Sequence, residues 1–223
     1  AARSRFDKHA GIDSEQGHLV LLAENTTGYK NLMKIVSIGF VEGFYYKPRI
    51  DMEVLEKYSE GIIALSACLS GDIPNALLQG NYNKAKEIAL KFISIFGKDN
   101  FFLELQMNNL EEQNLVNQGL IKLGRELGIP LIATNDVHYL RRQDARAQEI
   151  LMCIQTGKSI NDDDRMKFDS EELYLKSPEE MAELFKNIPE ALENTVKVAQ
   201  RCNVQLEFGK LHLPKFDVPE GEE

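Results

Sequence analysis

Four side chains at three separate places in the sequence are of the types that bind metals or transfer protons. His18 begins the segment HLVLLAE, Cys68 lies in SACLSGDIP, and Asp136 and His138 lie in IPLIATNDVHYL. Imidazole, thiolate and carboxylate groups together suit zinc or another first-row transition metal much better than magnesium or calcium. A carboxylate beside an imidazole can also act as an acid/base pair. These four residues are therefore the candidates for a metal site or a proton-transfer site.

The D-x-H triplet of Asp136 and His138 follows an apolar run, residues 129–133, that is typical of a buried strand. Both side chains emerge where strand becomes loop, and alternation along an extended chain predicts that they share one face. A D-x-H at a strand end is also typical of a capping aspartate beside a hydrogen-bonded surface histidine. This stretch alone leaves the two interpretations open.

Cys68 and His18 have similar pairs of interpretations. A thiol that ends an apolar strand, here residues 61–67, is usually a small core hydrophobe, and a histidine at a strand edge is usually satisfied by backbone groups. The position of Cys68 favours a site, because it follows its strand as the D-x-H triplet follows its own. The turn at residues 70–72 opens a helix behind it, as a βα loop should. We therefore expect these residues to meet at one rim.

Composition limits the class of protein. A chain of 223 residues, 43% of them hydrophobic, is long enough for one substantial α/β domain. The net charge of −9 argues against nonspecific nucleic-acid binding by this chain alone, although bound divalent metals or a basic neighbouring domain could reverse that locally. Three cysteines without a C-x-x-C spacing indicate neither a disulfide framework nor a zinc finger, and favour a reducing cytoplasm. No signal peptide or 18-residue apolar run indicates secretion or a membrane span.

Short apolar runs alternate with helical patterns along the chain. The runs at residues 18–24, 61–67, 101–107 and 129–133 predict strands, and the first is apolar enough to be buried on both faces of a parallel sheet. Strand, helix and strand at this spacing predict βαβ units with right-handed crossovers, in a parallel sheet or barrel.

Capping signals and helical spacing locate the helices. Thr27 is a possible cap for the first one, Asp51 caps a short helix through Tyr58, and Ser177-Pro178-Glu179-Glu180 is a capping box with proline at the first helical position. Further helices are expected at residues 72–79, at 82–96 closed by a glycine, and up to about residue 127. In the helix after the D-x-H triplet, the residues expected to face the core are Ile150, Leu151 and Ile154.

Two arginines are candidates for binding phosphate. Arg49 lies in FYYKPRID beside Lys47 and two tyrosines, and Arg141 opens the helix after the D-x-H triplet. Guanidinium groups suit phosphate because of their fork of donors. A surface turn at Arg49 and a solvent-facing Arg141 are the alternative interpretations.

Several phrases occur together and in order, namely HLVLLAENTTGYKNL, LSACLSGDIP, IPLIATNDVHY, IPEALENTVKVAQRCNV and LHLPKF. They resemble the PHP (polymerase and histidinol phosphatase) domain of bacterial DNA polymerase III alpha subunits, over essentially the whole chain. The resemblance implies an α/β fold, a distorted (βα)7 TIM-like barrel that is incomplete because its first strands and helices are absent. It divides the chain into a partial PHP domain, residues 1–212, and a linker toward a polymerase palm domain, residues 213–223.

The resemblance also implies that His18, Cys68, Asp136 and His138 occupy metal-ligand positions. The implied cofactor is a divalent metal, zinc before manganese or iron. The family pattern has an H-x-H, an Asp-His pair and a glutamate ahead of the point where this sequence begins, and none of them is found here. We therefore expect the site to be incomplete in this chain, and the missing strands to leave apolar edges open.

The implied parent is a replicative DNA-directed DNA polymerase in the cytoplasm, a nucleotidyltransferase of DNA replication that would contact DNA, other replisome subunits and the remainder of its own chain, with no membrane. For this region the resemblance implies a metal-dependent phosphoesterase, in several family members a 3′–5′ exonuclease. The alternative is a non-catalytic module that stabilises the polymerase core or docks a proofreading subunit. A free-standing small-molecule phosphatase is disfavoured, because both ends of the sequence look cut from a longer protein.

Overall fold

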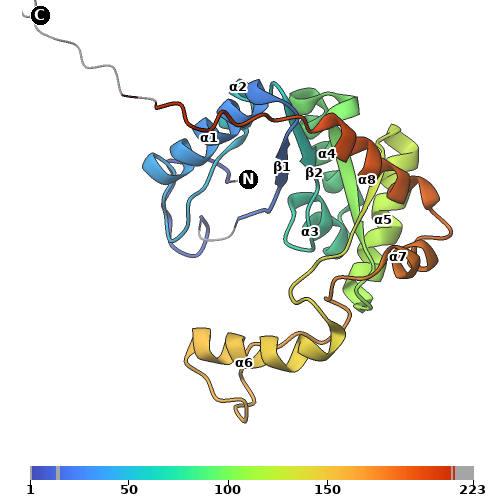
Figure 1. Ribbon diagram of the computed structural model, residues 1–223. Coiled ribbons are helices and arrows are strands. Elements are labelled where there is room, and N and C mark those ends of the chain that lie inside the picture. Colours follow the sequence, from blue (N-terminus) through green and yellow to red (C-terminus); the bar gives the residue numbers. More distant parts are fainter. Residues whose placement is uncertain (1, 14–15, 212, 214–223) are drawn as a thin grey trace, which may run out of the picture.

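The centre of the molecule is a four-stranded sheet in the order β1-β2-β3-β4. A computed structural model describes residues 2–13, 16–211 and 213. The strands are β1 Val20–Ala23, β2 Ile62–Leu65, β3 Phe101–Gln106 and β4 Leu131–Thr134 (Figure 1). β2, β3 and β4 are parallel to one another, and β1 runs antiparallel to β2. This is a mixed α/β fold in which the predicted parallel order holds for the last three strands.

Helices follow each strand, as the alternating pattern predicts. In chain order they are α1 Thr26–Val41, α2 Met52–Lys57, α3 Asp72–Leu78, α4 Tyr82–Phe96, α5 Glu111–Leu127, α6 Ala145–Thr156, α7 Pro178–Leu184 and α8 Pro189–Arg201, with short 3-10 turns at η1 Lys98–Asn100 and η2 Arg142–Asp144. The predicted caps at Asp51 and Ser177 are confirmed, the second as a full capping box. The cap of α1 is Asn25 and not Thr27, because the side-chain Oδ1 of Asn25 accepts the Gly28 N–H at 3.0 Å.

The two faces of the sheet are covered differently. One face carries Phe101, Leu103 and Leu105 of β3 and packs against α3, α4 and α5 in the main core. On the opposite face, Phe102 packs with a smaller cluster that includes Val198 of α8. Beyond Phe102 the same face of β3 turns polar, because alternate residues project to one side of a strand. The sheet therefore offers an apolar floor at one end of this face and a polar floor at the other.

The expectation that the first strand is buried on both faces of a parallel sheet is wrong. β1 is an edge strand, Val20 is exposed, and its register pairs Val20 with Leu65 and Ala23 with Ile62. Its apolar residues pack on both faces at the edge of the sheet, and none of them lies in a central strand. As a result, the beginning of β1 lies beside the carboxyl end of β2.

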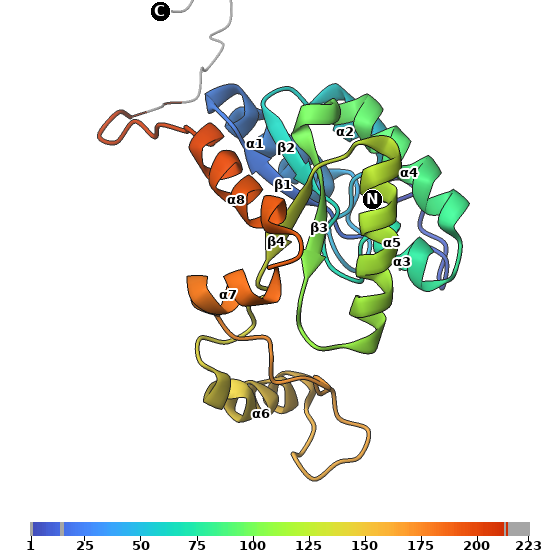
Figure 2. The ribbon, with the colours of Figure 1, turned by 90° about the vertical axis from the view of Figure 1, so that its right-hand side faces the viewer.

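The expectation that Ile150, Leu151 and Ile154 face the core is also wrong. Their exposed fractions are 44%, 59% and 71%, while Met152 and Cys153 are the buried residues of α6. The helix lies on an arm that leaves the sheet after β4 and returns before α7, well away from the strands in both views (Figures 1 and 2). Helical spacing identified an apolar face of the helix correctly, but it did not indicate whether that face packs against the core.

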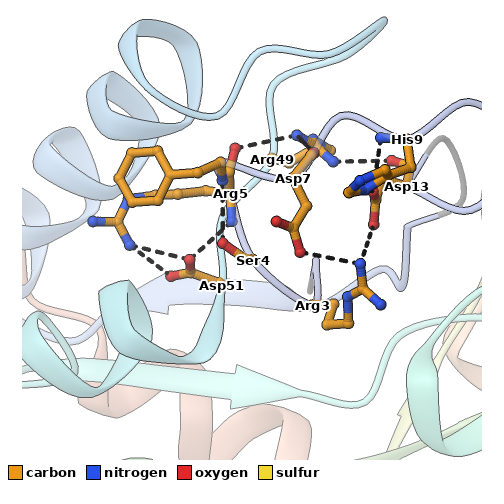
Figure 3. A network of polar contacts seen from close by, with 9 residues as sticks. Arg3, Ser4, Arg5, Asp7, His9, Asp13, Arg49 and Asp51 are labelled. Carbon is orange, nitrogen blue, oxygen red and sulfur yellow. Dashed lines mark hydrogen bonds and ion pairs between the residues drawn. The ribbon is translucent and has the colours of Figure 1, made fainter.

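The segment before β1 is held against the α1–α2 connection by two arginines (Figure 3). Arg49 is buried and donates to four backbone carbonyl oxygens, those of Arg5, Asp7, Asp13 and Gly43, at 2.7 to 3.1 Å. Arg5 in turn donates to both carboxylate oxygens of Asp51, the cap of α2, at 3.0 and 3.1 Å. This network ties the start of the described chain to the body of the domain.

The proposed linker, residues 213–223, lies outside the described residues except for Leu213. None of the helices in the described part has the length and apolar character that a bilayer crossing requires.

The core predicts a large effect for Phe92 of α4. Phe92 is buried, and its ring centroid lies 5.3 Å from that of Phe101 in β3. Phe92→Ala should lower the free energy of unfolding by about 3–5 kcal/mol, through lost burial and a residual cavity. Leu90→Ala on the exposed side of the same helix is the control and should stay within about 0.5 kcal/mol of the parent. Urea unfolding measures both, and equal effects would contradict the assigned core.

The Arg5–Asp51 contact predicts a dependence of stability on pH. Burial opposes ionisation of Asp51, but hydrogen bonds from the Arg5 and Val54 amides and from the Arg5 guanidinium hold its pKa below the usual value. Asp51 therefore stabilises the fold at pH values above about 3.9, its unfolded value, and this contribution is lost as the pH falls through the lower folded value. Asp51→Asn should flatten the acid limb of a plot of stability against pH.

The control for that measurement is Asp169→Asn, because the side chain of Asp169 is largely exposed. Urea unfolding between pH 2 and pH 7 should give parallel curves for the control and the parent. An acid limb of Asp51→Asn as steep as that of the parent would show that Asp51 is not responsible.

Candidate metal centre

His18 and Cys68 meet because β1 is antiparallel to β2. The register that pairs Val20 with Leu65 brings the residues before β1 to those after β2. The His18 N–H donates to the Ser70 carbonyl oxygen at 2.9 Å, and the Cys68 Sγ lies 3.7 Å from His18 Nδ1. Two ligands of one tetrahedral zinc would be about 3.6 Å apart, given usual Zn–S and Zn–N bond lengths. The pair therefore has a separation that suits shared metal ligation.

The turn that presents Cys68 is tight. Ala67 has a φ of +64°, a region that L-residues rarely adopt, and the Gly71 N–H donates to the Cys68 carbonyl oxygen at 2.8 Å. A Cβ at Gly71 would lie 2.2 Å from the Ser66 carbonyl oxygen, so only glycine fits there. The thiol is half-buried and not sealed in the core, unlike that of Cys153. The backbone thus aims Cys68 at the rim of the sheet.

Asp136 reaches the same rim from β4. The strand ends at Thr134, and Asp136 has a φ of +55°, which Asp and Asn tolerate better than most residues. Its Oδ2 accepts a hydrogen bond from Asn108 Nδ2 at 3.1 Å. The left-handed turn breaks the extended alternation that was expected to put Asp136 and His138 on one face.

His138 lies beside Asp136 but faces a different neighbour. Its Nδ1 lies 2.9 Å from the Asp136 carbonyl oxygen and 3.8 Å from Oδ1 of the same residue. The ring also makes an edge contact with Phe168 of the arm, at 4.7 Å between centroids. The first contact suits the tautomer with its proton on Nδ1, which leaves a lone pair on Nε2.

Three of the four predicted residues line one open hollow of about 510 Å³ at the carboxyl ends of the parallel strands. We call it the rim hollow; it is lined by His18, Leu19, Val20, Ala67, Cys68, Glu104, Gln106, Thr134 and Asp136. His138 is not among these residues. Within residues 2–13, 16–211 and 213, no three His, Cys, Asp or Glu side chains are grouped closely enough to hold a metal ion. The described residues thus bring together one ligand pair and one further carboxylate.

Sequence analysis missed a row of polar side chains on β3 and its extension, Glu104, Gln106 and Asn108, which we call the β3 polar row. All three are buried, and Glu104 Oε2, Gln106 Oε1 and Asn108 Oδ1 have no hydrogen-bond partner among the described residues. A buried acceptor without a donor costs about 1–3 kcal/mol, so these oxygens suit a hydrated or cationic neighbour. The signal was present in FFLELQMN, where polar residues alternate with apolar ones in an otherwise core-like strand.

Glu104 is the most constrained member of the row, with an exposed fraction of 5%. Its Oε1 accepts from Thr134 Oγ1 at 2.6 Å and from Gln106 Nε2 at 3.1 Å. Burial raises the pKa of Glu104, and the Asp136 carboxylate adds to the rise, while these two hydrogen bonds oppose it. A carboxyl group is therefore kept at the floor of the rim hollow against its desolvation cost.

The two arginines expected to bind phosphate do not line the rim hollow. Four of the five N–H donors of Arg49 serve backbone carbonyls and the side chain is buried, so the geometry gives it a structural role and does not support phosphate binding. Arg141 is exposed at the start of η2. Lys176 was missed: it is buried, its backbone N–H donates to Asn135 Oδ1 at 3.2 Å, and it interacts electrostatically with Asp136.

Comparison with known proteins gives the context for this geometry. A family model described as the PHP domain matches residues 4–108, which include His18, Cys68 and the β3 polar row. Asp136 and His138 lie beyond the matched part. The family match therefore includes two of the four predicted ligands, His18 and Cys68.

The relatives extend the similarity over the whole chain. It is 51% identical over 221 residues to the DNA polymerase III subunit alpha of Borreliella burgdorferi, 48% identical over 220 residues to that of Treponema pallidum, and 44% identical over 232 aligned residues to that of Thermus aquaticus. These alignments cover 98 to 99% of this chain. The chain spans 19% of the length of each of these curated relatives.

Proposed function

We propose that this chain is the PHP region of a DNA polymerase III alpha subunit and that its rim hollow binds a divalent metal for phosphoester hydrolysis. The observation that carries the first part is the identity of 51% to such a subunit over 98% of the chain. The second part is supported by the convergence of His18, Cys68 and Asp136 on one hollow. The activity of the larger protein would be DNA-directed DNA polymerisation in DNA replication, with DNA, other replisome subunits and the rest of the polymerase as partners.

The finer fold that we propose is an incomplete, distorted PHP barrel over residues 1–212, followed by a linker at residues 213–223. Three parallel strands with α3, α4 and α5 on one face and a hollow at the carboxyl ends of the strands are consistent with a barrel wall. β1 supplies the edge at which further strands would join, because its outer side lacks a strand partner among the described residues.

The proposed metal is zinc before manganese or iron, because a thiolate and an imidazole are the closest pair of donors. His18 and Cys68 would hold it from one side, and Asp136 and His138 would complete its coordination from the β4 side. Since the described residues hold no group of three such donors, binding would require a small closure of the hollow or donors from outside the described part.

In the proposed reaction, a bound divalent metal supplies activation of water and stabilisation of the leaving oxygen. The water oxygen bonds to phosphorus, and the bond from phosphorus to the 3′ oxygen of the preceding nucleotide breaks. The proton released from water passes to the leaving 3′ oxygen. Nδ1 of His138 lies 2.9 Å from the Asp136 carbonyl oxygen, which leaves the lone pair on Nε2 as the one that would bind the metal. Lys176 adds positive charge on the Asp136 side, where the phosphate would lie.

The alternative function is a structural module that stabilises the polymerase core or docks a proofreading subunit. Two observations favour it: the absence of a three-donor group among the described residues, and the exposed apolar face of α6. The β3 polar row argues against it, since a purely structural sheet has no need of buried acceptors without donors.

Metal binding is the first test. Cobalt(II) added to the metal-free natural protein that contains this chain should produce a sulfur-to-cobalt charge-transfer absorption, because Cys68 would be a ligand. Cys68→Ser should abolish this absorption. Cys153→Ser is the control and should retain it, because Cys153 is buried in the α6 arm away from the rim hollow. An absorption that survives Cys68→Ser would remove Cys68 from the site.

Catalysis is the second test. A 3′–5′ exonuclease assay on the natural protein should lose activity when a chelator removes the metal. Asp136→Asn should lower kcat by at least about 100-fold, because it removes the carboxylate charge and yet keeps a residue that tolerates a φ of +55°. The rate is measured by release of labelled 3′ nucleotides.

The matched control is Asp163→Asn, which removes an exposed carboxylate in the loop after α6 and should leave the rate unchanged. Exonuclease activity that is indifferent to both the chelator and Asp136→Asn would eliminate the catalytic proposal and favour the structural module.

A further inference from the structure

Glu104 is bonded to the residues that precede both ligand-bearing turns. On the β2 side its backbone N–H donates to Ser66 Oγ at 2.9 Å, and its carboxyl interacts with the backbone amide of Ala67. Ser66 and Ala67 immediately precede Cys68. On the β4 side its Oε1 accepts from Thr134 Oγ1 at 2.6 Å. Thr134 lies two residues before Asp136.

The remainder of the β3 polar row continues this connection. Gln106 Nε2 donates to Glu104 Oε1 at 3.1 Å and lies 3.3 Å from Thr134 Oγ1, and Asn108 Nδ2 donates to Asp136 Oδ2 at 3.1 Å. Successive residues of one strand face thus contact the β4 turn at two points. Only Glu104 also has contacts on the β2 side.

Both turns need such support, because each contains a residue in the left-handed region, Ala67 at φ +64° and Asp136 at φ +55°. Residues held there cost energy and persist only when their surroundings fix them. Backbone pairing joins β2 to β3 and β3 to β4, but this pairing ends before either turn begins. Glu104 supplies a bond toward each turn, through its backbone N–H to Ser66 and through its carboxyl to Thr134, and so fixes the two turns relative to each other.

We infer that Glu104 is a positioning residue that holds the Cys68 turn and the Asp136 turn at a fixed separation across the rim hollow. Glu104 would hold this geometry in the metal-free protein. The importance of that geometry for function rests on the proposed metal site. It assigns to β3 a role that neither the predicted ligand set nor the family match identifies. A leucine would fill this core position at lower desolvation cost, but it would leave the Thr134 hydroxyl without its acceptor.

The test of positioning itself is amide hydrogen exchange on the metal-free natural protein that contains this chain. Glu104→Ala, which keeps the backbone bond to Ser66, should raise exchange at least about 5-fold in residues 134–138. Ser66→Ala, which removes the acceptor of that bond, should raise exchange in residues 66–71, and peptides of α4 should stay unchanged in both variants. Thr134→Val, which removes only the hydroxyl donor, should raise exchange in residues 134–138. Thr195→Val is the matched control, because its hydroxyl makes a similar 2.6 Å bond within α8 and connects neither turn.

Cobalt(II) affinity is the quantity that would stay unchanged if Glu104 had only a structural role. Outer residues that orient metal ligands typically contribute 10- to 100-fold in affinity. Glu104→Ala and Thr134→Val should each raise the cobalt Kd by about 10-fold or more and shift the sulfur-to-cobalt absorption. Glu104→Gln keeps an acceptor for Thr134 and should restore most of the affinity. The double variant Glu104→Ala/Thr134→Val should be little worse than Glu104→Ala alone.

Several results would overturn the inference. These are parent-like exchange in residues 134–138 of Glu104→Ala or in residues 66–71 of Ser66→Ala, an unchanged cobalt absorption in Glu104→Ala, or a Glu104→Gln loss as large as that of Asp136→Asn, which would make Glu104 a ligand. If Glu104→Ala does not fold, Thr134→Val and Glu104→Gln decide the question. A parent protein that gives no cobalt absorption would reject the proposed metal site, and the exchange data would then decide the positioning role separately.

Discussion

The antiparallel pairing of β1 with β2 is the constraint on which the rim hollow depends. Had β1 run parallel to its neighbour, His18 at its beginning would lie at the opposite end of the sheet from Cys68. The register from Val20–Leu65 to Ala23–Ile62 places the imidazole 3.7 Å from the thiol instead. The parallel order of β2, β3 and β4 then adds Asp136 at the same edge, because carboxyl ends of parallel strands coincide.

The buried polar residues at this edge of the sheet carry a cost in stability. A sheet face that packs Phe102 and Val198 at one end carries Glu104, Gln106 and Asn108 at the other, with three acceptor oxygens that lack donors among the described residues. Replacing buried polar groups by apolar ones of similar size is often neutral or stabilising. Their presence here is physically understandable if they orient the turns that carry Cys68 and Asp136, or if they face a cation.

Local signals predicted local structure well. The four strands, the caps at Asp51 and Ser177, and the glycine end of α4 follow from hydrophobic periodicity and capping chemistry, which act over a few residues. Predictions failed where a distant surface decides. The apolar face of α6 was expected in the core and is exposed, and Arg49, expected at a turn that could hold phosphate, is buried on backbone carbonyls of a segment 36 to 44 residues away.

The sequence by itself determined the strand and helix order, the acidic composition and the four candidate ligands, because residue types and their spacing are local properties. Only the tertiary structure decided the direction of β1, which unites His18 with Cys68, and the left-handed turn at Asp136, after which the His138 ring contacts Phe168 of the arm. It also showed that the polar side chains of the β3 polar row are buried. Strand direction and long-range contacts arise from packing across the chain, and no short window of sequence contains them.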